Sequence, residues 1–104
     1  MHWRQNLLQT TLFGGLLNCA ALAYAQNSDV AKGQNTYETI CAVCHGAKGE
    51  GGMGLPLKGI SDRMTSEQTV EKIKNPKDSM PKLFPAALSE QAVQDVAAFV
   101  RTLR

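Results

Sequence analysis

The sequence predicts a small all-α protein of three to four helices, and three observations lead to this prediction. After residue 26 there is no run of alternating apolar and polar residues, the pattern of a half-buried β-strand. Three segments instead place apolar residues at helical spacing, and each begins at a residue type that caps helices. Glycines and prolines are concentrated between those segments, as expected for loops.

The beginning of the chain has the pattern of an export signal rather than of a folded element. Arg4 gives a basic start, residues 7–22 are mostly apolar and uncharged, and small residues precede a cleavage position after Ala25. Polar residues interrupt the apolar stretch, so it matches poorly the roughly 20 apolar residues of a membrane span. We therefore expect a signal peptide over 1–25, with an uncleaved amphipathic anchor as the alternative, and a mature domain over 26–104 in the periplasm.

The mature domain carries little net charge and only two cysteines. The whole chain has 11 Lys and Arg against 9 Asp and Glu, which indicates no basic surface for nucleic acid. Cys19 lies in the predicted signal peptide, where its neighbours weakly resemble a lipid-attachment box. Removal of the signal peptide leaves Cys41 and Cys44 as one pair. A domain this small usually needs a disulfide, a metal or a cofactor to complete its core.

The first helix is predicted from about Asp29 to Cys41. Ser28 or Asp29 can cap its start, and it delivers the cysteine pair at its C-terminal end. One side of it carries apolar and small residues at helical spacing, namely Val30, Gly33, Tyr37 and Ile40.

A glycine-rich loop precedes the second helix. Residues 46–59 contain six glycines, so they cannot hold a helix or strand of any length. The second helix is predicted to begin at Thr65, because Thr65 and Gln68 have the spacing of a capping box. It is predicted to end near Asn75, because Pro76 follows.

A proline-rich segment precedes the third helix. Three prolines within residues 75–85 predict an extended and stiff backbone. The third helix is predicted to open at Ser89, with Leu88 and Val93 placed as a hydrophobic staple and an apolar stripe that ends at Leu103.

The chemistry is concentrated in Cys41-Ala-Val-Cys44-His45, which has the form of a haem attachment motif. Thiols at i and i+3 can add to the two vinyl groups on one edge of a haem, and the adjacent His45 can then reach the iron. The alternatives are a thioredoxin-like redox pair, half of a zinc site, or a structural disulfide. Zinc takes four ligands, whereas the mature chain offers three ordinary nitrogen or sulfur donors, and a redox pair of that kind needs a βαβ context.

A second iron ligand is expected far along the chain, and three methionines are candidates. Met53 lies in the flexible loop after His45, and Met64 directly precedes a helix cap, where an apolar side chain packs. Met80 lies in the stiff segment beside Pro81, which can hold a weak thioether ligand in place. Met80 is therefore the predicted ligand, since Met/His ligation accompanies electron transfer at raised potential. A role as core filler is the alternative for any methionine.

Several motifs together resemble those of a class I c-type cytochrome, over nearly the whole mature chain. They are Gly33-x-x-x-Tyr37, the pentad from Cys41 to His45, the loop from Gly46 to Gly52, Leu55-Pro-Leu-Lys-Gly59, Met80-Pro81 and the closing segment from Leu88 to Val100. The resemblance implies a cytochrome c fold wrapped around one covalently bound haem c. It also implies that Gly33 lets the first helix touch the last, with Tyr37 near Val96 and Phe99.

The resemblance also implies a role for Pro56, whose carbonyl would accept a hydrogen bond from the far nitrogen of His45. The mature chain departs from many relatives in having no Trp to hold a haem propionate. Arg63, Lys58 and backbone amides are candidates for that role. The interval from His45 to Met80 is short for the family, which predicts a trimmed loop at the haem edge.

We expect a monomeric, periplasmic single-electron carrier that is not an enzyme and exchanges electrons with donor and acceptor proteins. The alternatives are a haem subunit of a dehydrogenase or oxidase complex, and a haem enzyme or gas sensor with an open sixth site. Four lysines near the predicted ligand could attract an acidic partner, although such runs usually mark a solvated face. They are Lys72, Lys74, Lys77 and Lys82.

Overall fold

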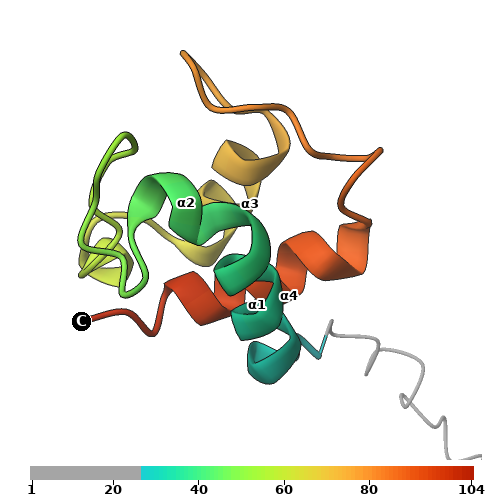
Figure 1. Cartoon of the computed structure of the whole chain (residues 1–104). Coiled ribbons are helices and arrows are strands. Elements are labelled where there is room, and N and C mark those ends of the chain that lie inside the picture. The colour runs from blue at the N-terminus through green and yellow to red at the C-terminus, as the bar shows by residue number, and fades with distance from the viewer. Residues whose placement is uncertain (1–26) are drawn as a thin grey trace, which may run out of the picture.

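The computed structural model describes residues 27–104, and within them the protein consists of helices and loops without a β-strand (Figure 1). The all-α prediction is confirmed. The predicted signal peptide lies outside the described residues. The elements are α1 (Val30–Thr36), the π-helical turn η2 (Tyr37–Cys41), α2 (Ala42–His45), the 3₁₀ turn η3 (Ile60–Asp62), α3 (Ser66–Lys74) and α4 (Glu90–Val100).

The first helical stretch is longer than the sequence predicts. Asp29 caps it, with its side chain accepting from the amide of Lys32, but the helix continues past Cys41 through α2 to His45. Gly46 ends it, since its φ of 89° is open to glycine and strained for other residues. Cys41 therefore ends the π-helical turn, and Cys44 and His45 lie on the α-helical backbone that follows it.

Helices α1 and α4 cross in close contact, as the resemblance implies. A Cβ at Gly33 would lie 2.0 Å from the carbonyl oxygen of Asp95, so only glycine fits at the crossing. Next along, the rings of Tyr37 and Phe99 meet with centroids 5.3 Å apart. Tyr37 is fully buried, in a core cluster with Ile60, Val96 and Val100.

A buried carboxylate fastens the beginning of the first helix to α4. Asp95 is only 4% exposed, and its Oδ1 accepts hydrogen bonds from the amide of Asp29 (2.7 Å) and from Nε2 of Gln91 (2.9 Å). Both donors satisfy a carboxylate that would otherwise be costly to bury.

The predicted starts of the other two helices and the predicted end of α3 are confirmed, whereas α4 ends at Val100, before the predicted Leu103. Thr65 and Gln68 form the reciprocal capping box at the start of α3, and α3 ends at Asn75. Ser89 caps α4 by accepting from the amide of Ala92 at 3.1 Å. Leu88 and Val93 are both buried, as expected for residues placed to form a staple.

Two long loops separate the helices. The loop after α2 folds back toward the C-terminus, where the amide of Gly59 donates to the carbonyl of Leu103 at 2.9 Å. The segment 75–88 forms an arch that leaves α3 and returns to α4 (Figure 1). None of the helices within residues 27–104 is long and apolar enough to cross a membrane.

Candidate haem site

The two cysteines of the pentad lie one helical turn apart, where η2 passes into α2. Both thiols are unpaired and partly buried, so the structural disulfide is not formed. Burial raises the pKa of the Cys41 thiol to about 11, which keeps it protonated at neutral pH. The reactive cysteine of a redox pair instead has a lowered pKa, so this environment does not favour the thioredoxin-like alternative.

The ring of His45 is held by a single backbone acceptor. Its Nδ1 lies 2.7 Å from the carbonyl oxygen of Leu55. Because a carbonyl can only accept, Nδ1 carries the proton and Nε2 is left as the metal-binding nitrogen.

The family resemblance implies that Pro56 supplies this carbonyl, whereas the structure has the carbonyl of the preceding residue, Leu55, in that place. The amide of Gly54 donates to the carbonyl of Cys44 at 2.7 Å, which fixes the path of the loop so that Leu55 comes opposite the ring. The carbonyl of Pro56 instead lies 3.5 Å from Nη2 of Arg63.

Backbone hydrogen bonds hold the loop against the end of α2. The amide of Gly51 donates to the carbonyl of His45 at 2.7 Å. Gly54 also leaves room for the imidazole, because a Cβ there would lie 2.8 Å from Cε1 of His45. The sequence identified the loop by its glycines but gave no separate role to Gly54.

Tyr37 connects the core to the residue that follows His45. Its hydroxyl donates to the carbonyl oxygen of Gly46 at 2.6 Å. Burial raises the pKa of Tyr37, and the nearby Cys41 and Glu50 act in the same direction. The sequence assigned Tyr37 only a packing role, since nothing in its spacing indicates the hydrogen bond.

The three methionines lie in different surroundings. Met53 is 83% exposed, in the loop that holds His45. Met64 packs against the core cluster, which agrees with the packing role predicted for it. Met80 is partly buried, in the arch between Pro76 and Pro81.

The residues considered for polar roles around a haem are partly engaged elsewhere. The guanidinium of Arg63 points toward the carbonyls of Lys58 (3.4 Å) and Pro56.

Two of the four lysines near Met80 have partners within the protein. Lys74 forms an ion pair with Glu90, and Lys82 donates to acceptors at the end of α3. Lys72 and Lys77 are exposed. Within residues 27–104, no three His, Cys, Asp or Glu side chains gather in a way that would hold a metal ion.

The donor set fits a covalently attached haem. It offers two unpaired thiols spaced for the vinyl groups, and one imidazole whose free nitrogen is fixed by the bond at the other nitrogen. When bound, a haem supplies an iron that changes oxidation state by one electron.

Comparison with known proteins gives a consistent result. Residues 28–100 match the family model described as cytochrome c oxidase, cbb3-type, subunit III. A cytochrome c-553-like protein of Synechocystis is 28% identical over 80 residues, which cover 76% of this chain and 73% of that protein. The structure of cytochrome c6 from the diatom Phaeodactylum tricornutum superposes with a TM-score of 0.61 at 26% identity, over 70% of this chain and 91% of that one. The chain therefore belongs to the cytochrome c family, as a small class I c-type cytochrome with one covalently bound haem c that carries single electrons.

Proposed function

We propose that the mature protein is a free periplasmic electron carrier, whose haem is attached through Cys41 and Cys44 and whose iron is bound by His45 and Met80. The observation that carries the proposal is the bond from Nδ1 of His45 to the carbonyl of Leu55. It leaves Nε2 for the iron and fixes the plane of the ring, as the outer partners of metal-bound histidines do.

The surroundings of the three methionines support the assignment of Met80. Met64 is occupied in packing against the core, and Met53 lies on the same loop as the His45 acceptor. Met80 lies on a separate segment, between two prolines that stiffen it. A His/Met pair stabilises reduced iron and raises the potential, which suits a carrier. An iron held by both His45 and Met80 would have no position left for a substrate, which supports a carrier rather than an enzyme.

The leader supports the periplasmic location. The family match begins at residue 28, shortly after the predicted cleavage position at Ala25. A single exported domain with one haem can exchange electrons with separate donor and acceptor proteins as a monomer.

Visible spectroscopy of the haem-loaded protein, with Met80→Ala as the variant, tests the proposal. The wild-type protein is expected to be low-spin, with the weak charge-transfer band at the red end that accompanies methionine ligation. That band should vanish in Met80→Ala and remain in Met53→Ala, which is the matched control because it removes an exposed methionine. A high-spin spectrum of the wild-type protein would overturn the proposal and favour an open sixth site.

The description of the matching family favours a second candidate, a haem subunit of an oxidase complex. Purification from the periplasm without a detergent distinguishes the two. A free carrier is expected to elute at the size of one domain, whereas a subunit would elute together with its partner chains.

A further inference from the structure

We propose that Lys82 is a positioning residue that fastens the Met80 segment to the C-terminal end of α3. Lys74 supports this arrangement by joining α3 to α4 and by contacting Phe84 in the segment. The inference rests on the proposed role of Met80 as iron ligand. It concerns how this chain holds that side chain in place, and it assigns to two of the four lysines a task within the protein.

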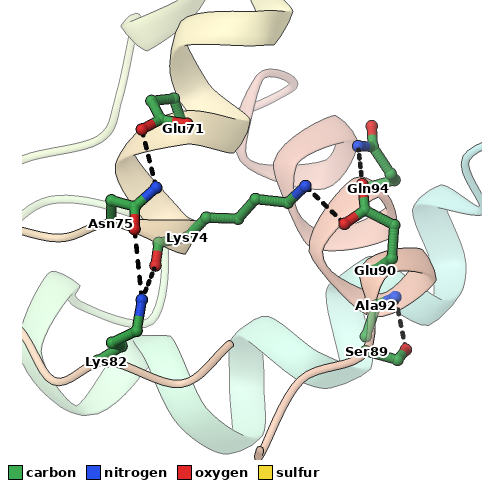
Figure 2. A network of polar contacts seen from close by, with 8 residues as sticks. All are labelled: Glu71, Lys74, Asn75, Lys82, Ser89, Glu90, Ala92 and Gln94. Atoms are coloured by element: carbon green, nitrogen blue, oxygen red, sulfur yellow. Dashed lines mark hydrogen bonds and ion pairs between the residues drawn. The ribbon is translucent and has the colours of Figure 1, made fainter. Parts of the chain in front are cut away.

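Lys82 ties the segment to the C-terminal end of α3. Its Nζ donates to the carbonyl oxygen of Lys74 at 3.1 Å and to Oδ1 of Asn75 at 3.3 Å (Figure 2). The last carbonyls of a helix have no partner within the helix and carry partial negative charge, so a lysine there is stabilising. Lys82 comes two residues after Met80, and its tie therefore fixes the backbone close to the proposed ligand.

Asn75 is itself oriented for this contact. Its Nδ2 donates to Oε1 of Glu71 at 2.8 Å, one turn earlier in α3. With the amide nitrogen engaged there, Oδ1 faces Lys82 (Figure 2). The orientation of the acceptor Oδ1 of Asn75 is thus determined by its contact with α3 rather than by the arch.

Lys74, the last residue of α3, joins α3 to α4 and contacts the arch through the ring of Phe84. Its Nζ lies 2.5 Å from Oε2 of Glu90, in the first turn of α4, and 4.9 Å from the centre of the Phe84 ring. Gln94 holds the same carboxylate by donating to Oε1 at 3.1 Å. The backbone carbonyl of Lys74 thus accepts the bond from Lys82, and its side chain lies over the Phe84 ring and pairs with Glu90.

These side-chain contacts matter because the arch lacks the i to i+4 backbone hydrogen bonds of a helix. The last such bond before the arch runs from the amide of Asn75 to the carbonyl of Glu71, and the next runs from the amide of Ala87 to the carbonyl of Leu83. Pro76 and Pro81 stiffen the chain between these points, but a stiff segment still needs a tie to set its direction. Lys82 is the tie placed nearest to Met80.

A titration of the ferric, haem-loaded protein with imidazole tests the proposal. Imidazole competes with a thioether for the iron, so its apparent affinity reports how firmly the thioether is held. We expect Lys82→Ala to bind imidazole about two- to fivefold more tightly than the wild-type protein, the size expected for loss of one exposed charged contact. Asn75→Ala removes one of the two acceptors and should give a smaller increase. The double variant should show less than the sum of both effects, because the residues act on each other.

Lys77→Ala is the matched control, because it removes the same charge from an exposed position in the same segment. It should bind imidazole as the wild-type protein does. Lys82→Arg keeps the charge and the donors, and is expected to restore the wild-type affinity. If Lys82→Ala gives too little loaded protein to measure, the comparison of Asn75→Ala with Lys77→Ala decides the question.

The failures of the two proposals are distinguishable. If the wild-type spectrum shows methionine ligation while wild-type, Lys82→Ala and Lys77→Ala bind imidazole equally, the tie is overturned and the ligand assignment stands. If the wild-type spectrum shows no methionine ligation, both proposals are overturned. In the Met80→Ala background, Lys82→Ala should have no further effect. A persisting effect there would mean that Lys82 acts on the iron by another route, and it would overturn the positioning role.

Discussion

Residues 41–59 and residues 75–88 each carry one proposed iron ligand, and they are held in place by different interactions. The first segment is fixed by short backbone bonds, such as that from the amide of Gly51 to His45, and by the buried hydroxyl of Tyr37. The second is an arch tied to α3 by the exposed side chain of Lys82, while the partly exposed Lys74 contacts Phe84 in the arch and joins the two flanking helices. One ligand is therefore held by backbone bonds next to the buried Tyr37, and the other by side-chain contacts at the surface.

This difference has a dynamic consequence. Backbone bonds beside a buried side chain break mainly when the surrounding structure opens, whereas exposed charged contacts are individually weak and screened by salt. We expect the Met80 side to open first and to respond to ionic strength, and the His45 side to remain until global unfolding. Such an order leaves the haem attached while one ligand exchanges.

The largest effect is expected on the His45 side, in Gly54→Ala. The added Cβ would lie 2.8 Å from Cε1 and 2.9 Å from Nδ1 of His45, so either the ring or the loop must move. We expect a loss of about 2–3 kcal/mol in the free energy of unfolding, the size found for overpacking at a tight site, and a reduced yield of protein with covalent haem. Denaturant unfolding and mass spectrometry measure the two quantities.

Gly52→Ala is the control for that variant. The added Cβ would meet only the carbonyl oxygen of Cys44, at 3.2 Å. The loss in the free energy of unfolding should therefore be clearly smaller than that of Gly54→Ala. Equal losses in both variants would mean that the loop as a whole, rather than the space beside the ring, limits substitution.

A smaller effect is expected for Tyr37→Phe. The variant keeps the ring against Phe99 but removes the 2.6 Å bond to the carbonyl of Gly46, which should cost about 1 kcal/mol of unfolding free energy. Thr39→Val is the control, since it removes an exposed hydroxyl bond within the same helical stretch. It should cost less than about 0.5 kcal/mol.

The pH dependence of Tyr37→Phe provides a second test on the same variant. Burial raises the pKa of Tyr37 above its ordinary value of 10.0, so above that pH the unfolded chain loses this proton before the folded protein does. The wild-type protein should therefore lose stability as the pH rises past 10, more steeply than the variant. Parallel curves from denaturant unfolding would contradict the assignment.

The smallest effect is expected in Glu90→Gln, which breaks the ion pair between the two helices that flank the other segment. The hydrogen bond from Lys74, followed by that from Gln94, holds the pKa of Glu90 below its ordinary value of 4.5. Its contribution is therefore present above that pH and is lost as the pH falls through the lowered pKa. Thermal unfolding should show a small deficit at pH 7 that shrinks in high salt and disappears in acid. A deficit of equal size in acid and in salt would show that charge is not the cause.

Much of the helical framework could be predicted from local signals. The spacing of Thr65 and Gln68, and the position of Ser89 before an apolar stripe, identify two helix starts without reference to the rest of the chain. Local hydrogen bonding decides such ends. The π-helical turn and the continuation of the first helix to His45 have no comparable capping signal in the sequence.

The sequence by itself determined the pentad, the helix caps and the need for glycine at position 33, because each follows from chemistry within a few residues or from the close crossing that the family resemblance implies. Only the tertiary structure decided that Leu55 rather than Pro56 meets His45, and that two lysines are engaged within the protein. The physical reason is that a loop's path is set by contacts distant in sequence. A shift of one residue changes which carbonyl faces the ring while leaving the composition of the loop unchanged.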